Sequence, residues 1–397
     1  TIALIPDLAD SRGVQRFQLE LLDRSGNLVA EISDSGVPET EYRWDGRGRQ
    51  GTVVPDGSYS VRLTVQYRHG NRPQAVSIPF EVDTVPPRAT VTAGDTIFSP
   101  DGDGDKDSIA IDQQSSGDAR WQGRIVSASD DTVVRTWEFS GALSPITWDG
   151  TEEGGAVTSD GEYRYRIAGE DAAGNRFSTT TDRFRVDTRD VDAAVRLGSG
   201  AFSPNGDGVQ DTVTIIPSIS IETPVASWTV SMRSTEDDSV VWEETRSGGI
   251  ETLQWDGRRS DGRQSADGEY RASLTVGFAR GDDASVSSAR SVTLDTVAPQ
   301  AEVELSSPVI SPNGDGNLDE QIITQATSEE ERWRAQILNE EGTEVGRWEW
   351  SGRAPETVSF SGLDTARNRV SDGRYSYRLS ATDTAGNSTR VGPLDFE

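Results

Sequence analysis

Three stretches of this sequence place carboxylate and amide oxygens at alternate positions around glycines. They read FSPDGDGDKDS (98–108), FSPNGDGVQDT (202–212) and ISPNGDGNLDE (310–320). A calcium loop needs oxygen ligands at alternate positions, because a tight loop turns every second side chain inward, and a glycine must permit the sharp turn. The spacing therefore predicts three candidate calcium loops.

The candidate ligands are the acidic and amide side chains of each loop, which follow a serine at the first position. They are Asp101, Asp103, Asp105 and Asp107; Asn205, Asp207 and Asp211; and Asn313, Asp315, Asn317 and Asp319. The serine in place of Asp, and the lack of a bidentate Glu at position 12, predict that any calcium binding is weak. The alternative interpretation is a solvated turn held by Asx hydrogen bonds without a metal. In both interpretations the loop lies at a module end and should help to fix the angle between neighbouring modules.

The loops belong to a module that recurs four times. A Trp-Asp-Gly triplet, degenerate in the fourth copy, is followed in every copy by an Asp-Gly-x-Tyr box. The tyrosines of the box are Tyr59, Tyr163, Tyr270 and Tyr375, in steps of 104, 107 and 105 residues. An aromatic residue early in each module keeps the same steps, so three landmarks in one register indicate a repeat protein.

Short alternating strands fill each module. VRLTVQY (61–67) and YRYRIAG (163–169) place every second residue on one face, and clusters of Gly, Pro, Asn and Asp separate such runs. No segment shows a sustained helical period. About seven short strands in roughly 100 residues are typical of an antiparallel immunoglobulin sandwich. The predicted fold class is therefore all-β, a linear array of four immunoglobulin-like antiparallel β-sandwiches.

The two recurring boxes fit this fold. Immunoglobulin sandwiches contain a tyrosine corner, in which a phenol at the start of a strand bonds to the upstream backbone. We interpret Asp-Gly as the turn and the tyrosine as the first residue of that strand. We interpret the tryptophans Trp44, Trp148 and Trp255 as core packing, with the following Asp capping a turn.

The junctions between modules also recur, as FEVDTVPPRATV, FRVDTRDVDAAV and VTLDTVAPQAEV. Each reads as a strand end, a short turn and a new strand, and two contain proline, so we expect a semi-rigid array. TIALIP at the N-terminus aligns with TVTIIP at 212–217, which predicts an N-terminally truncated first repeat and a chain that is part of a longer array. The predicted repeats are 1–85, 86–189, 190–297 and 298–397.

The run from Phe17 to Val65 resembles the Ig-like domain of the bacterial flagellar hook-cap (hook-assembly scaffold) protein. The shared pattern is a hydrophobic strand, then D-x-x-G-x-x-V, W-D-G and P-D-G-x-Y. The resemblance covers about 50 residues of each repeat and implies the fold; such domains are also reiterated in secreted and surface proteins. SPNGDG (203–208 and 311–316) is similar to the start of gliding-motility-associated sorting domains. DAAGN (171–175) and DTAGN (383–387) are similar to hairpins of bacterial extracellular Ig-like repeats. Both similarities imply an extracellular or cell-surface location, with the periplasm as the alternative.

The composition limits the kinds of partner that this chain is expected to bind. A formal charge of −29 opposes binding to nucleic acid or to anionic lipid and favours cations and basic partners. No run approaches the roughly 18 apolar residues that a membrane span needs. The sequence contains no cysteine, so disulfides and Cys–metal sites are excluded.

Catalytic motifs do not assemble from this sequence. The single histidine, His69, lies in a hairpin-like RHGN, and acidic pairs such as Glu152-Glu153, Asp237-Asp238 and Glu329-Glu330-Glu331 lie in polar loop contexts. We expect no enzyme activity, no required cofactor and calcium as the one candidate ligand. The leading interpretation is an extracellular stalk, spacer or surface-fibre segment whose partners are neighbouring Ig-like repeats.

Two alternatives remain open. An adhesin-like or glycan-binding array would need a repeated aromatic platform, for which the candidates are Trp137, Trp242, Trp348 and Trp350. A flagellar or motility assembly scaffold would need further N-terminal elements of the hook-cap type. A protein or glycan partner at the cell surface is compatible with the first of these.

Overall fold

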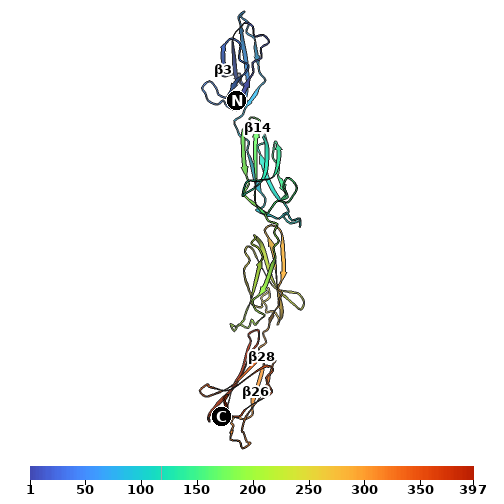
Figure 1. Ribbon diagram of the computed structural model, residues 1–397, viewed down its shortest axis with the longest axis vertical. Coiled ribbons are helices and arrows are strands. Elements are labelled where there is room, and N and C mark those ends of the chain that lie inside the picture. Colours follow the sequence, from blue (N-terminus) through green and yellow to red (C-terminus); the bar gives the residue numbers. More distant parts are fainter. Residues whose placement is uncertain (118) are drawn as a thin grey trace. The chain divides into compact units, whose positions relative to one another are not determined.

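The computed structural model describes residues 1–117 and 119–397, and every regular element in them is a β-strand (Figure 1). The all-β fold class is thereby confirmed. None of the described residues belongs to a helix that could cross a membrane. The chain divides into two compact units, Thr1–Thr188 and Arg189–Glu397. Each unit holds two sandwiches with separate hydrophobic cores, whereas the repeat boundaries near 85, 189 and 297 stay predictions.

Repeat 1 comprises strands β1 to β7. Its larger sheet has the order β3-β2-β5-β6, with β7 also paired to β5, and its smaller sheet contains β1 and β4. The core between them is built from Phe17, Leu19, Leu21 and Trp44. The strands are β1 (Ile2–Leu4), β2 (Val14–Asp23), β3 (Leu28–Ser35), β4 (Tyr42–Trp44), β5 (Gly57–Tyr67), β6 (Gln74–Val76) and β7 (Phe80–Val82).

Repeat 2 comprises strands β8 to β16. The small sheet β13-β10-β8 faces a six-stranded sheet in the order β12-β11-β14-β16-β9, in which β15 pairs β14. Trp148 lies fully buried between Phe98, Tyr163 and Phe184. The strands are β8 (Ala89–Ala93), β9 (Ile97–Phe98), β10 (Ile109–Ser115), β11 (Ala119–Ser127), β12 (Val133–Ser140), β13 (Ile146–Trp148), β14 (Gly161–Asp171), β15 (Arg176–Thr180) and β16 (Phe184–Val186).

Repeat 3 comprises strands β17 to β25 and has the topology of repeat 2. The small sheet is β17-β19-β22 and the large sheet is β18-β25-β23-β20-β21, with β24 paired to β23. The strands are β17 (Ala193–Leu197), β18 (Ala201–Phe202), β19 (Val213–Ile219), β20 (Val225–Ser234), β21 (Val240–Arg246), β22 (Leu253–Trp255), β23 (Gly268–Phe278), β24 (Asp283–Ser287) and β25 (Val292–Leu294).

Repeat 4 comprises strands β26 to β32. Its sheets are β26-β27-β30 and β29-β28-β31-β32, and the long β32 replaces the two separate strands that follow the corresponding hairpin in repeat 3. The strands are β26 (Ala301–Leu305), β27 (Gln321–Thr327), β28 (Glu330–Asn339), β29 (Glu344–Gly352), β30 (Thr357–Phe360), β31 (Tyr375–Thr382) and β32 (Ser388–Phe396).

The predicted tyrosine corner occurs in every repeat. Tyr59 donates its phenol proton to the Pro55 carbonyl at 2.7 Å, and Tyr163 and Tyr270 repeat this four-residue reach at 2.6 and 2.7 Å. Tyr375 makes the same bond to the Ser371 carbonyl. The phenol thus satisfies a turn carbonyl that the sheet leaves unpaired, which is why the box needs a tyrosine.

The tryptophans of Trp-Asp-Gly are buried, as predicted. Each indole N–H donates to the carbonyl three residues later, for example Trp255 to Arg258 at 2.8 Å. The following Asp accepts the amide of the second residue after it, as Asp256 accepts from Arg258 at 3.1 Å. Repeats 1 and 2 contain the same two bonds, so the predicted turn cap is confirmed.

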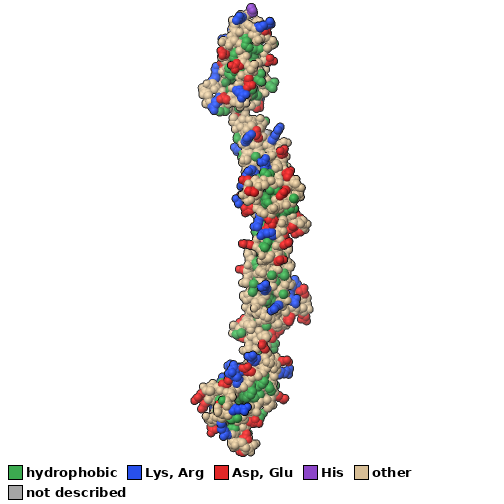
Figure 2. All heavy atoms as spheres, viewed as in Figure 1, with side chains coloured by type: hydrophobic (Ala, Val, Ile, Leu, Met, Phe, Trp, Pro, Cys, Tyr) green, Lys and Arg blue, Asp and Glu red, His purple; other side chains and the backbone are tan. Residues whose placement is uncertain are grey.

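The surface is charged with both signs. Figure 2 shows acidic side chains and arginines interspersed over the visible face of the molecule. Many of them form exposed ion pairs, such as Arg43–Glu41 at 2.8 Å and Arg176–Glu170 at 2.8 Å. Exposed pairs of this kind contribute little to stability, so the fold depends on its cores and backbone ladders.

Candidate functional site

The three acidic loops close on themselves through one carboxylate. In loop 202–212, Asp211 accepts the Gly206 amide at 2.7 Å and the Gly208 amide at 2.8 Å. Asp107 does the same with Gly102 and Gly104, and Asp319 with Gly314 and Gly316. The ninth position of each loop is therefore a structural anchor for two backbone amides, whether or not a metal is present.

The glycines of the loop adopt backbone conformations that other residue types rarely adopt. Gly206 and Gly208 have φ values of +82° and +87°, in the left-handed region where glycine carries no steric penalty. The corresponding glycines of the other two loops share this region. The alternating glycines thereby direct two amides toward one carboxylate.

Loop 98–108 gathers three carboxylates. Asp101, Asp103 and Asp107 each bring an oxygen within 4.8 Å of the other two, whereas Asp105 is not part of this group. Among the described residues, this is the one cluster of at least three acidic or histidine side chains at metal-ligand distances. Three like charges at this spacing repel one another.

Loops 202–212 and 310–320 resolve the same repulsion with an amide. Asn205 stands where loop 98–108 has Asp101, and its Nδ2 donates to the Asp207 carboxylate at 3.2 Å. Asn313 donates likewise to Asp315 at 3.0 Å. The amide hydrogen replaces a repulsion with a hydrogen bond, so these two loops are internally satisfied without a cation. Asn317 contributes its backbone amide to Asp315 at 2.8 Å.

In the second unit, loop 202–212 binds a hairpin of the next repeat. Asn387, at the end of the DTAGN hairpin between β31 and β32, accepts hydrogen bonds from the Ser203 hydroxyl and, at 3.1 Å, from Asn205 Nδ2. Its own Nδ2 donates to the Asp295 carbonyl of the linker at 2.9 Å. One amide thus ties the loop, the linker and the hairpin together.

The residues that form the contact between loop 202–212 and the hairpin are buried. Ser203 and Asn387 are 0% and 1% exposed, and Ala385 beside them is 0% exposed. A Cβ added to Gly386 would lie 3.0 Å from Val209 Cγ1, so a glycine allows close approach there. A buried polar group that loses its partner costs about 1–3 kcal/mol, so the pairing at this junction is specific.

The first unit contains the same linker bond. Asn175, in the DAAGN hairpin between β14 and β15, donates Nδ2 to the Asp83 carbonyl of the preceding linker at 3.0 Å. This bond matches that of Asn387 to Asp295, and both span 92 residues. Asn175 is half-buried.

A further tie at the linkers was not predicted. Asp56, the first residue of an Asp-Gly-x-Tyr box, accepts both the amide and the hydroxyl of Thr84, at 3.0 and 2.9 Å. Asp160 and Asp267 hold Thr188 and Thr296 in the same way. We predicted these aspartates only as turn residues. The Asp-Thr dipeptide in all three junction strings was the signal that could have identified their partner.

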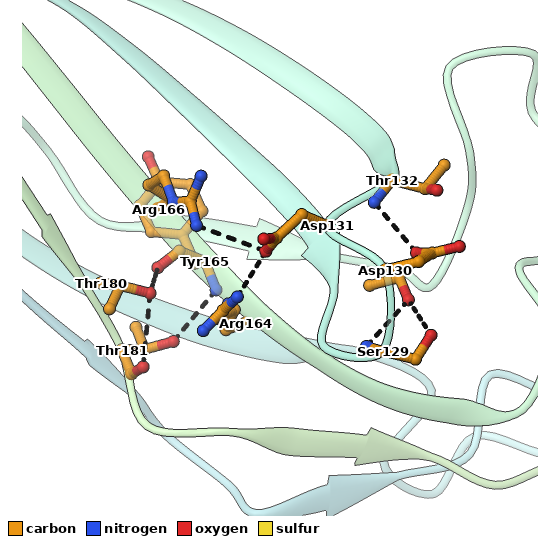
Figure 3. Close-up of polar contacts among 10 residues, drawn as sticks. Ser129, Asp130, Asp131, Thr132, Arg164, Tyr165, Arg166, Thr180 and Thr181 are labelled. Carbon is orange, nitrogen blue, oxygen red and sulfur yellow. Dashed lines mark hydrogen bonds and ion pairs between the residues drawn. The ribbon is translucent and has the colours of Figure 1, made fainter.

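The acidic pairs considered for catalysis lie in exposed turns or strand edges. Asp237 and Asp238 form the β20–β21 turn, where Asp237 accepts the Ser239 amide at 3.0 Å and Asp238 has φ of +58°. The equivalent turn of repeat 2 appears in Figure 3, where Asp131 points toward Arg164 and Arg166 of β14. The Arg164 hydrogen bond lowers the pKa of Asp131, so this carboxylate serves an ion pair.

The remaining candidate residues are placed as follows. His69 is exposed at the tip of the hairpin that follows β5, and Glu152 and Glu153 are exposed. The Trp137, Trp242, Trp348 and Trp350 side chains are half-buried and pack against the cores of their own repeats. Trp137, for example, meets Tyr165 edge-on at 6.1 Å. These aromatics therefore contribute to core packing at the sheet edge.

Fold and junctions together define a tandem Ig-like repeat protein. The family model of the FlgD Ig-like domain matches residues 7–68, which confirms the resemblance of repeat 1. A search of curated proteins gave no significant match.

Three solved structures match this chain at low identity. A tetra-tandem repeat from the extending region of a large adhesion protein is 16% identical, covering 96% of this chain and 92% of its own, with a TM-score of 0.30. A structure of a 1.5-MDa bacterial ice-binding adhesin is 14% identical, covering 78% and 96%, with a TM-score of 0.32. Fibronectin(III)-like modules of Clostridium thermocellum CbhA are 13% identical, covering 52% and 94%, with a TM-score of 0.27.

Proposed function

We propose that this chain is a non-catalytic structural array, a stalk, spacer or surface-fibre segment of a larger bacterial protein outside the cytoplasm. The observation that carries this proposal is the junction at Asn387, where one buried amide joins a loop, a linker and a hairpin from two successive repeats. An array that holds its ends apart needs such contacts, because a linker alone would let neighbouring repeats rotate freely.

The linker ties support the same role. Each of the three Asp-Thr linkers is held by the aspartate of the preceding Asp-Gly-x-Tyr box through a backbone and a side-chain bond. At about 0.5–1.5 kcal/mol per hydrogen bond, two such bonds restrict a short linker substantially. The linker thereby begins in a fixed direction from its own repeat.

A non-catalytic role fits the placement of the candidate acids. The acidic pairs lie on exposed turns and edges, and His69 is exposed at a hairpin tip. The half-buried tryptophans supply no free aromatic platform, so nothing in their geometry favours glycan binding over a spacer role. Neighbouring Ig-like repeats are the partners that the junctions support.

For the cation, we propose a weak calcium site in loop 98–108, formed by Asp101, Asp103 and Asp107. Hard oxygen ligands suit calcium, and a site open to solvent falls in the weak range of extracellular modules. In the other two loops an asparagine stands where loop 98–108 has Asp101, and its side-chain amide donates to Asp207 or Asp315, so we restrict the proposal to repeat 2.

Small-angle scattering of the whole chain tests the structural role. Four sandwiches joined end to end would reach on the order of 130–170 Å, from strands of about 30 Å plus loops. Replacing Asn387 by Ala should broaden the distance distribution through added bending. A maximum dimension typical of a globular 43 kDa protein, or an unchanged profile in the variant, would contradict the proposal.

A further inference from the structure

The large sheet of repeat 2 has a polar trough on its solvent-exposed face. Its volume is about 910 Å³, and it crosses strands β12, β11, β14 and β15. Arg120, Gln122, Glu138, Ala168 and Ser178 are among the residues that line it. The strand registers place these side chains on one face, because they occupy directly opposed or alternate positions.

The centre of the trough is low because Ala168 is small. Ala168 lies opposite Gln122, and the other repeats have a longer, hydroxyl-bearing residue at this place in the sheet. The matching residues are Thr64, Thr275 and Ser380. Only repeat 2 therefore presents a bare methyl group as the floor between its polar walls.

Two arginines lie directly opposite each other in the next row of this face. They are Arg124 of β11 and Arg166 of β14. Like charges at directly opposed positions destabilise a sheet. The other repeats avoid this repulsion at the same place. Their pairs are Glu20–Arg62, Ser231–Ser273 and Gln336–Arg378.

The first two of these pairs are bonded across the strands. Arg62 donates to Glu20 at 2.8 Å, and the hydroxyls of Ser231 and Ser273 lie 2.8 Å apart. The sheet itself therefore does not require two cations at this position, and repeat 2 differs from a pattern that stabilises the other sandwiches.

Two guanidinium groups on this face have no partner. Arg166 forms an ion pair with Asp131 at 3.4 Å (Figure 3). In contrast, neither Arg120 nor Arg124 takes part in a hydrogen bond or ion pair within residues 1–117 and 119–397. Both are exposed, and they lie four residues apart on β11, about 13 Å by the rise of a strand. Gln122 lies between them, so an unpaired cation stands on each side of the trough centre.

The charge of the whole chain does not decide what binds here. Charges are screened over about 8 Å at physiological ionic strength, so the groups that face the trough determine its selectivity. Glu170 is already paired with Arg176 at 2.8 Å. Glu138, opposite Gln122, is exposed and has no such partner within residues 1–117 and 119–397.

Glu138 narrows the ligand. Its carboxylate repels a purely anionic chain such as an acidic peptide, but it accepts hydrogen bonds from hydroxyl groups. A ligand that suits the trough therefore has anionic groups for Arg120 and Arg124 and hydroxyl donors between them. An acidic polysaccharide combines these two features in one extended chain.

We propose that the trough of repeat 2 binds an acidic polysaccharide, an extended sugar chain that carries carboxylates. Arg120 and Arg124 pair with carboxylates on the two sides, Glu138 and Gln122 bond to hydroxyls, and Ala168 leaves room for a sugar ring. This inference goes beyond the spacer role and does not depend on it.

The test uses the whole chain and a fluorescently labelled oligogalacturonate, measured by fluorescence anisotropy. We expect saturable binding that weakens as salt is added, because exposed ion pairs are screened. A neutral malto-oligosaccharide of the same length and a polyglutamate peptide of the same charge should each bind at least about ten-fold more weakly, since each lacks one of the two kinds of group.

Two variants locate the site. Arg120→Ala with Arg124→Ala should weaken binding about ten-fold or more, because two charge-assisted contacts are lost. Ala168→Leu should weaken it to a similar extent by filling the floor, without removing any charge. Urea unfolding confirms that both variants remain folded.

The control variant is Arg196→Ala with Arg271→Ala, which removes the same charge from exposed strand positions of repeat 3. It should bind as the unmodified chain does. The absence of saturable binding, equal affinity for polyglutamate or for the neutral oligosaccharide, or an equal loss in the control variant would overturn the proposal.

Discussion

The two units use the same hairpin asparagine, but they surround it differently. Asn175 and Asn387 both end a D-x-A-G-N hairpin, and both donate to a linker aspartate carbonyl 92 residues earlier. In the first unit, Asn175 is half-buried and makes this bond to the linker. In the second unit, Ser203 and Asn205 of the acidic loop donate hydrogen bonds to the Asn387 amide oxygen, and the Asn387 side chain is buried.

The second unit adds side-chain contacts to the linker bond that both units share. The linker bond uses backbone on the accepting side, so any linker of this conformation can provide it. The loop contact requires particular side chains at Ser203 and Asn205, and it removes the amide from water. We therefore expect the loop contact to determine the strength of the junction in the second unit.

The units also differ in how their loops handle charge. Loop 98–108 of the first unit has Asp101 where loop 202–212 of the second unit has Asn205. The asparagine serves twice, because its amide satisfies Asp207 and also reaches Asn387. An aspartate could accept bonds but could not make these two donations, so the amide contact with Asn387 requires an asparagine at this position.

The largest effect should come from removing the hairpin asparagine. Asn387→Ala leaves the buried Ser203 hydroxyl without its acceptor, which costs about 1–3 kcal/mol of junction stability. Asn175→Ala, the matched change in the first unit, removes one half-buried bond and should cost about 0.5–1.5 kcal/mol. Urea unfolding of the whole chain, followed by hydrogen exchange at each loop, measures both. Equal losses in the two variants would show that the loop adds nothing to the linker bond.

The second-largest expected effect is a calcium response that differs between loops 98–108 and 202–212. We expect millimolar calcium to stabilise repeat 2 by RT ln(1 + [Ca]/Kd), about 1.4 kcal/mol at a ten-fold excess over Kd. Magnesium at matched ionic strength controls for general screening of a chain of charge −29. Hydrogen exchange at Gly102 and Gly104, compared with Gly206 and Gly208, reports each loop separately.

Exchanging the decisive residue between the loops sharpens this test. Asp101→Asn should remove the calcium response of loop 98–108, because it removes one of the three carboxylates and lets the amide donate to Asp103, as Asn205 donates to Asp207. Asn205→Asp should create a response in loop 202–212 and weaken the contact with Asn387. If calcium and magnesium protect loop 98–108 alike, the loop is a turn and linker element only.

The local parts of this structure could be predicted from the sequence, whereas the contacts between repeats could not. The tyrosine corners and the caps after Trp44, Trp148 and Trp255 join residues at most four positions apart, and the motif itself contains both partners. The bond from Ser203 to Asn387 spans 184 residues, and no local pattern indicates which hairpin faces which loop. The Asp56–Thr84 hydrogen bond is an intermediate case. Both residues recur in the sequence, but only the folded structure shows that they pair.

A smaller effect separates the loops within the second unit. Ser203→Ala removes a buried hydroxyl that donates to Asn387, and we expect a loss of about 0.5–1.5 kcal/mol. Ser311→Ala changes the matching serine of loop 310–320, which is exposed, and should be close to neutral. The two loops share their internal bonds, so the comparison isolates the contact with the hairpin. Equal losses would assign the effect of Ser203 to the loop itself.

The smallest effect is a pH dependence of loop 310–320. The amides of Gly314 and Gly316 lower the pKa of Asp319 below its ordinary value of 3.8. A carboxylate with a lowered pKa in the folded state contributes stability that is fully present above its unfolded pKa and is lost as pH falls through the folded value. Hydrogen exchange at Gly314 and Gly316 should therefore accelerate, relative to the intrinsic rate, as the pH is lowered below about 4. Asp319→Asn should remove this dependence, because an amide oxygen still accepts but does not titrate in this range. An identical pH profile in the variant would mean that Asp319 does not hold the loop, and the closed loop geometry would then need another cause.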